Sequence, residues 1–141
     1  MANTVMTSFK SQLMEGTHDL ATGGDDFKLA LYTSSSSINA AGTTIYTTDD
    51  EVGNSGTYAA GGGALAGQEV TTDGTTGICN FDDLEFTSAT ITARYALIYN
   101  SSESNKAVCV LDFSTDQIST AGTFKIDFPV SGASTSIIRV A

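Results

Sequence analysis

Apolar and polar residues alternate, or gather in short apolar blocks, along most of the chain, and both patterns are typical of β-strands. The most apolar stretch runs from Ile91 to Phe113. Its pattern predicts two adjacent strands, 91–99 and 106–113, joined by the polar turn 100–105. Apolar side chains occur on both alternating faces of each strand, so we expect this hairpin at the centre of the fold, covered on both sides.

Other segments rich in β-branched and aromatic residues surround this hairpin, and most are bounded by glycine, aspartate or serine. The expected strands are 27–32, 64–72, 77–81, 84–86, 91–99, 106–113, 123–128 and 136–140. A turn is predicted at Asp73–Gly74, between 64–72 and 77–81, and a loop at 116–122, after the central hairpin. Such a series predicts an all-β domain, a β-sandwich or jelly roll of about seven to eight antiparallel strands.

A short N-terminal helix is predicted over 7–15, within an N-terminal helical segment 1–22. Phe9 and Leu13 stand four residues apart on one helical face, and Gly16 suits the position just after the helix. One of the two hydroxyl residues before Phe9 can serve as the N-cap. Because the apolar stripe is narrow, we expect this helix to lie across one end or edge of the sheets.

A long loop region, 33–63, consists mostly of serine, threonine, glycine, alanine and acidic residues. Long, weakly patterned segments inside compact domains are often functional or ordered by a partner. We therefore expect this region to contact another subunit. The candidate interface residues are Tyr46, Val52, Tyr58, Phe9 and Leu13.

The 141 residues suit a single domain, 1–141, with one core. Sixteen acidic and six basic residues give a formal net charge of −10, so direct binding to nucleic acid or to an anionic membrane is not expected. The acidic balance fits either general solubility or docking onto a basic partner, and composition does not separate these alternatives.

Both cysteines, Cys79 and Cys109, sit inside apolar strand-like runs, which predicts small buried side chains in a chain made in a reducing compartment. The first residues lack the basic and apolar regions of a secretion signal, and no window has the length of a membrane span. We therefore expect a soluble protein without a classical signal.

The sequence contains only weak patterns for catalytic, metal-binding or phosphate-binding sites. His18 precedes Asp19, but no partner nucleophile is evident, so a structural role is expected. The acidic clusters 25–26, 49–51 and 82–85 lack the spacing of a calcium loop and suit solvated turns better. No cofactor, metal or catalytic residue is predicted, and the run from Gly61 to Gly63, with no following lysine, is better explained by close-packed backbone.

Arg94 is the one charged residue whose position is unusual, since it lies mid-strand among apolar neighbours. A partly buried guanidinium needs a carboxylate partner. Asp112, on the adjacent strand, is the natural candidate, so a structural ion pair between Arg94 and Asp112 is expected.

Seven segments, spread along nearly the whole chain, share the pattern of one protein group. They are 9–19, 27–32, 56–62, 89–100, 106–113, 124–129 and 137–141. Over these segments the chain resembles small structural proteins of tailed bacteriophages. The resemblance implies a non-enzymatic virion component assembled in the host cytoplasm, most simply a head decoration or cement protein.

Under that resemblance, the implied partners are the major capsid protein and copies of the chain itself, as a trimer or dimer. An alternative is a neck, tail or baseplate component, which could be a module that binds a host glycan. For that alternative, the contact residues would be exposed loop aromatics and acids, namely Tyr46, Asp49, Asp50 and Tyr58.

Overall fold

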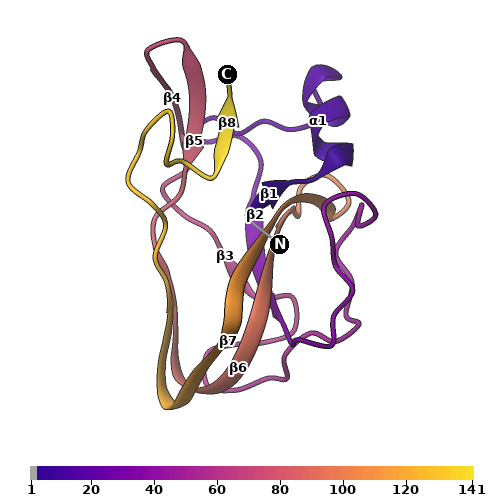
Figure 1. The fold of residues 1–141 in the computed structure, drawn as a ribbon, viewed down its shortest axis with the longest axis vertical. Coiled ribbons are helices and arrows are strands. Elements are labelled where there is room, and N and C mark those ends of the chain that lie inside the picture. Colours follow the sequence, from indigo (N-terminus) through magenta and orange to yellow (C-terminus); the bar gives the residue numbers. More distant parts are fainter. Residues whose placement is uncertain (1–2) are drawn as a thin grey trace.

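The computed structural model describes residues 3–141. Within these residues, eight strands form two antiparallel sheets, and one short helix precedes most of the strands (Figure 1). Buried apolar side chains from both sheets join one core. The predicted all-β, sandwich-like fold with a short N-terminal helix is therefore confirmed.

The larger sheet has the strand order β1-β7-β6-β2-β3. Its strands are β1 (Thr4–Val5), β2 (Phe27–Tyr32), β3 (Gly63–Ala64), β6 (Leu84–Asn100) and β7 (Lys106–Ile126). The predicted central hairpin is thus confirmed, with β6 and β7 in the middle of this sheet. Residues 96–100 and 107–111 are all buried, as apolar side chains on both faces require.

The β6–β7 ribbon is longer than the pattern predicted. Residues 116–122, expected to form a loop, continue β7, and 84–86 begin β6 rather than a separate strand. The ribbon bends sharply along its length (Figure 1). We call its irregular segment the ribbon corner: there the register shifts, and Ser88, Ser114 and Ala121 have positive φ. Such bulges sharpen strand twist and let one ribbon serve two layers of a core.

The smaller sheet has the order β4-β5-β8, with β4 (Glu69–Asp73), β5 (Thr76–Asn80) and β8 (Ile138–Val140). The predicted turn is present, with Gly74 at φ 60°. The expected strand 64–72 is instead two strands, because β3 pairs with β2 whereas β4 pairs with β5.

Helix α1 (Thr7–Met14) lies at one end of the molecule, near β8 (Figure 1). The expected hydroxyl N-cap was wrong: the N-cap is Met6, whose side chain is buried and whose N–H donates to the Val108 carbonyl. Attachment to β7 therefore fixes where the helix begins. Gly16 follows it at φ 75°, as predicted.

The long loop region 33–63 packs on its own chain. Ile38, Val52 and Tyr58 are buried in the core, and Ile45 makes an isolated bridge to Lys106. The apolar residues of this region therefore anchor it to the sheet. Cys79 and Cys109 are both buried free thiols, as their apolar surroundings predicted.

Candidate functional site

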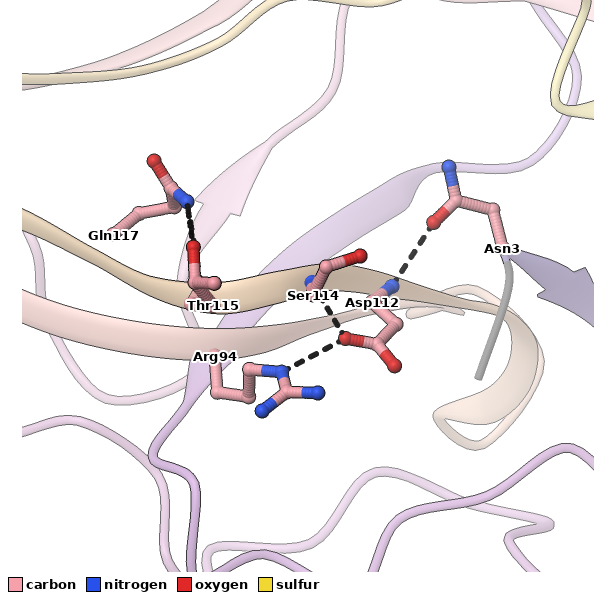
Figure 2. Close-up of polar contacts among 6 residues, drawn as sticks. All are labelled: Asn3, Arg94, Asp112, Ser114, Thr115 and Gln117. Atoms are coloured by element: carbon pink, nitrogen blue, oxygen red, sulfur yellow. Dashed lines mark hydrogen bonds and ion pairs between the residues drawn. The ribbon is translucent and has the colours of Figure 1, made fainter.

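Arg94 and Asp112 form an ion pair across the β6–β7 ribbon (Figure 2). Arg94 Nε lies 2.9 Å from Asp112 Oδ1, and the same oxygen accepts the Ser114 N–H at 2.8 Å. The Asp112 N–H donates to Asn3 Oδ1 at 2.9 Å. The pair lies where the register breaks between Ala93 and Tyr95. It therefore fastens the corner of the ribbon.

Burial makes this pair structurally important. The Asp112 side chain is 1% exposed, whereas that of Arg94 is 27% exposed and its guanidinium lies 5.3 Å from the Tyr95 ring centroid. The hydrogen bond from Arg94 holds the pKa of the Asp112 carboxyl well below its usual range. A carboxylate committed in this way is a structural group rather than a general acid or base.

A second polar cluster centres on the carboxylate of Glu51 in the long loop region. Its Oε2 accepts the Tyr46 hydroxyl at 2.6 Å, and its Oε1 accepts the Tyr58 hydroxyl and the Gly61 N–H, both at 2.7 Å. The Tyr58 oxygen also accepts the Leu31 N–H at 2.9 Å. Glu51 thus ties three parts of the loop region together, and Tyr58 ties them to β2.

Tyr99 completes this cluster from β6. Its ring stacks on that of Tyr46 with centroids 4.8 Å apart, and its hydroxyl donates to the Gly61 carbonyl at 2.6 Å. Burial, followed by the charge of Glu51, raises the pKa of Tyr99 to about 12. Burial likewise raises the pKa values of Tyr46 and Tyr58. These phenols stay protonated at neutral pH and act as hydrogen-bond donors.

The candidate interface residues are mostly internal, which corrects the expectation for them. Phe9, Val52 and Tyr58 are buried in the chain's own core, and Tyr46 and Leu13 are half-buried against it. A lone apolar residue in a polar segment can pack against its own domain or against a partner. Here these side chains pack against the core of their own chain. The burial of Tyr58 also removes it from the proposed glycan-contact set.

His18 belongs to a buried polar chain. Asn100 Nδ2 donates to His18 Nδ1 at 2.9 Å, so the ring proton is on Nε2, which donates to Gln12 Oε1 at 2.8 Å. Asn100 Nδ2 also donates to Asp25 Oδ2. Burial lowers the pKa of His18 despite the nearby Asp25 charge. Both ring nitrogens are therefore engaged in holding α1 and the following loop against β6.

The acidic turns have structural partners as well. Asp25 Oδ2 accepts the Asp19 N–H, and Asp83 accepts the Phe128 N–H and faces Lys125. Over residues 3–141, no three His, Cys, Asp or Glu side chains gather as a metal ion would require. At Gly62, φ is 79° and an added Cβ would overlap the Leu29 carbonyl. The glycine run is thus a place where backbone packs on backbone.

An apolar groove, which we call the end groove, lies between α1 and the smaller sheet. Two cavities of about 340 and 300 Å³ make it up, and they share Leu13, Arg139 and Val140. Met14 and Val140 on its walls are 85% and 57% exposed. Apolar side chains left open around a groove are typical of surfaces that bind protein segments. The end groove is therefore the candidate functional site, and sequence reasoning did not find it.

No family model, curated protein or solved structure matches this chain. Among the described residues, no helix combines the length and the apolar character needed to cross a membrane. The function is therefore argued from the surface of this chain.

Proposed function

We propose that this protein is a structural subunit of a tailed-bacteriophage virion, most simply a decoration or cement protein that bridges major capsid proteins on the head. The proposal assigns it a binding role and no catalytic step. A cement protein stabilises a shell because each contact it adds must be broken when the shell opens locally.

The observation that carries the proposal is the end groove. Large apolar side chains, Met14 and Val140, stand exposed there beside a sheet edge. Its basic lining residues, Lys10 and Arg139, are two of the six in a chain of net charge −10. An exposed apolar groove with a basic rim favours a protein partner over a small polar substrate.

The rest of the molecule suits a rigid building block. The Glu51 cluster fixes the long loop region and the Arg94–Asp112 pair fixes the ribbon corner, so the surface is pre-organised for binding. Pre-organisation lowers the ordering cost of each contact, and many weak contacts in a shell then add together. The acidic remainder of the surface would also repel DNA.

Particles assembled with and without this protein test the proposal. Removing it should lower the temperature at which heads release their DNA, and adding back the purified protein should restore that temperature. A variant with an altered end groove, Met14→Lys, should restore it less well than the wild type. Heads of equal stability with and without the protein would oppose the cement role.

A neck or tail component is the second candidate. It would use the same groove to contact a different ring of subunits, and it would leave head stability unchanged. The copy number in the particle, considered at the end of the Discussion, separates it from a head protein.

A further inference from the structure

The sheet edges of the described chain differ in how well they are protected. The two edges of the larger sheet, β1 and β3, have two residues each, and β8 has three. Strand β4 has five residues, all exposed, with Val70 52% exposed. Short strands, charged side chains and proline are the usual protection against pairing with another chain. Strand β4 is longer than the other edge strands and has no proline, so its two acids, Glu69 and Asp73, are its protection, and they oppose an acidic partner edge but not a basic one. An open edge of this kind is suited to binding another strand.

The opposite edge of the same sheet, β8, borders the end groove. No strand within residues 3–141 pairs with the outer side of β4 or of β8. The smaller sheet therefore has an exposed edge at each end, and each edge carries an exposed valine that lines the end groove, Val70 on β4 and Val140 on β8. A strand added at β8 would extend the sheet and cover the groove.

Register places the side chains of these two edges on matching faces. Through β5, Thr71 aligns with Arg139, so Glu69 and Asp73 share the face of Arg139. Val70 lies on the other face, which Val140 shares. A β4 strand of a second copy can lie beside β8 with Val70 on the groove face. Glu69 then faces Arg139 on one face of the sheet, and Val70 contacts Val140 on the other.

Like-on-like pairing of the edges is unfavourable. An antiparallel β4–β4 pair centred on Thr71 would set Glu69 against Asp73 of the other copy, and a β8–β8 pair centred on Arg139 would oppose two arginines. Like charges directly opposite each other destabilise a strand pair. Charge complementarity therefore selects β4 against β8.

We propose that β4 of one copy of this chain pairs with β8 of the next, with Val70 covering the end groove and Glu69 facing Arg139. The partner in this inference is a second copy of the chain. The inference rests on the proposed function in one respect, because assembly of a virion would supply the high local concentration of copies. Because β4 and β8 both run antiparallel to β5, the new pair is parallel. Parallel pairs are slightly weaker per residue, so the apolar and charged contacts matter.

This contact is head-to-tail, because different surfaces of the two copies meet. Such contacts close into rings when the rotation between copies allows it, and otherwise continue as open chains. A two-fold dimer is not expected from this contact, whereas a trimer or larger ring is. Of the two oligomers expected from the sequence, the contact favours the trimer.

Charge reversal tests the pairing in the purified full-length chain. The first variant, Glu69→Lys with Thr71→Lys, reverses the β4 edge, and the second, Arg139→Glu, reverses β8. A control matched to the first variant, Thr48→Lys with Asp49→Lys, makes the same net charge change as that variant. It lies on an exposed turn distant in sequence from both edges. Sedimentation velocity over a range of concentrations measures self-association, and circular dichroism checks that each variant folds.

We expect the wild type to self-associate and each edge variant to do so roughly a hundredfold more weakly, since opposed like charges cost several kcal/mol. The control should behave as the wild type. Mixing the β4 variant with the Arg139→Glu variant should restore association, because lysines face glutamate at one contact and Glu69 faces Arg139 at the next. The two variants must alternate, so the mixture should form open chains and even-numbered rings rather than a trimer. Restoration also excludes misfolding as the cause of the loss.

Three results would overturn the inference. They are a wild type that stays monomeric at every concentration, edge variants that associate like the wild type, and a control that loses association as strongly as the edge variants. Loss of association in the control would indicate that the contact lies in the long loop region instead. None of these results bears on whether the protein is present in virions, so failure of the inference is distinguishable from failure of the proposed function.

Discussion

Arg94 Nε and Asp112 Oδ1 lie 2.9 Å apart across two neighbouring strands, at the point where the β6–β7 ribbon leaves its regular register. The aspartate also accepts the Ser114 N–H, and Ser114 has φ 68°. One side-chain pair thus stabilises a backbone conformation that a non-glycine residue rarely adopts. Farther along β7, the Phe113 and Phe124 ring centroids lie 6.4 Å apart.

Replacing Arg94 should therefore destabilise the fold. Arg94→Met removes the hydrogen bond and the positive charge that Arg94 supplies to the buried Asp112 carboxylate, and breaking a buried ion pair by removing one partner is destabilising. Lys125→Met is the matched control, because Lys125 bonds Asp127 at 2.7 Å in an exposed pair, and exposed pairs contribute little. Thermal unfolding should give a clearly lower melting temperature for Arg94→Met than for the control. Equal melting temperatures would mean that the pair does not hold the corner.

The sequence predicted this pair because both residues belong to one hairpin, where adjacency follows from the turn. It also predicted β2 at its observed bounds and the turn at Gly74, where alternation and local turn chemistry agree. Residues 116–122 were mistaken for a loop because their side chains are mostly polar. They form a strand because their backbone pairs with β6, a contact that side-chain polarity does not reveal.

The roles of Tyr58 and Val52 illustrate another limit. Their isolation in a polar segment suggested an interface, yet both are buried in their own core. Whether such a residue anchors on its own domain or on a partner depends on contacts distant in sequence, such as the bond between Tyr58 and Leu31. The end groove was missed for the same reason, since Leu13 and Val140 meet only after folding.

Tyr58→Phe tests the Glu51 cluster. The change removes a hydroxyl that bonds both Leu31 and Glu51, leaving buried polar groups without partners, and should cost about 1–3 kcal/mol of unfolding free energy. Tyr95→Phe is the control, since within residues 3–141 no hydrogen bond is made by the Tyr95 hydroxyl, and should change stability by less than about 0.5 kcal/mol. Urea unfolding measures both values. A loss for Tyr58→Phe no larger than for the control would show that the cluster contributes nothing.

His18 should make stability depend on pH. Its folded-state pKa lies below the ordinary histidine value of 6.5, so the unfolded chain binds the proton more readily. The contribution is complete above about pH 6.5 and is lost as the pH falls toward the folded-state pKa. His18→Gln, which cannot titrate, should show a smaller loss of unfolding free energy between about pH 7.5 and pH 5.5 than the wild type. Identical pH profiles would contradict the assignment of a neutral, buried imidazole.

Gly62 should tolerate no side chain. Gly62→Ala places a methyl group against the Leu29 carbonyl in a left-handed conformation and should cost more than about 1 kcal/mol. Gly53→Ala is the control, because an added Cβ at Gly53 meets nothing within 4 Å, and should shift stability by less than about 0.5 kcal/mol. Chemical denaturation of both variants gives the comparison. Similar values would mean that the backbone contact at Gly62 relaxes without cost.

The central claim is that this chain is a structural subunit of a phage head. Quantitative mass spectrometry of purified particles, with the major capsid protein as reference, tests it most directly. A decoration or cement protein should be present at about one copy per capsid protein chain, since it occupies sites that repeat over the whole shell. A few copies per particle would transfer it to the neck or tail. Its absence from the particles would contradict the account.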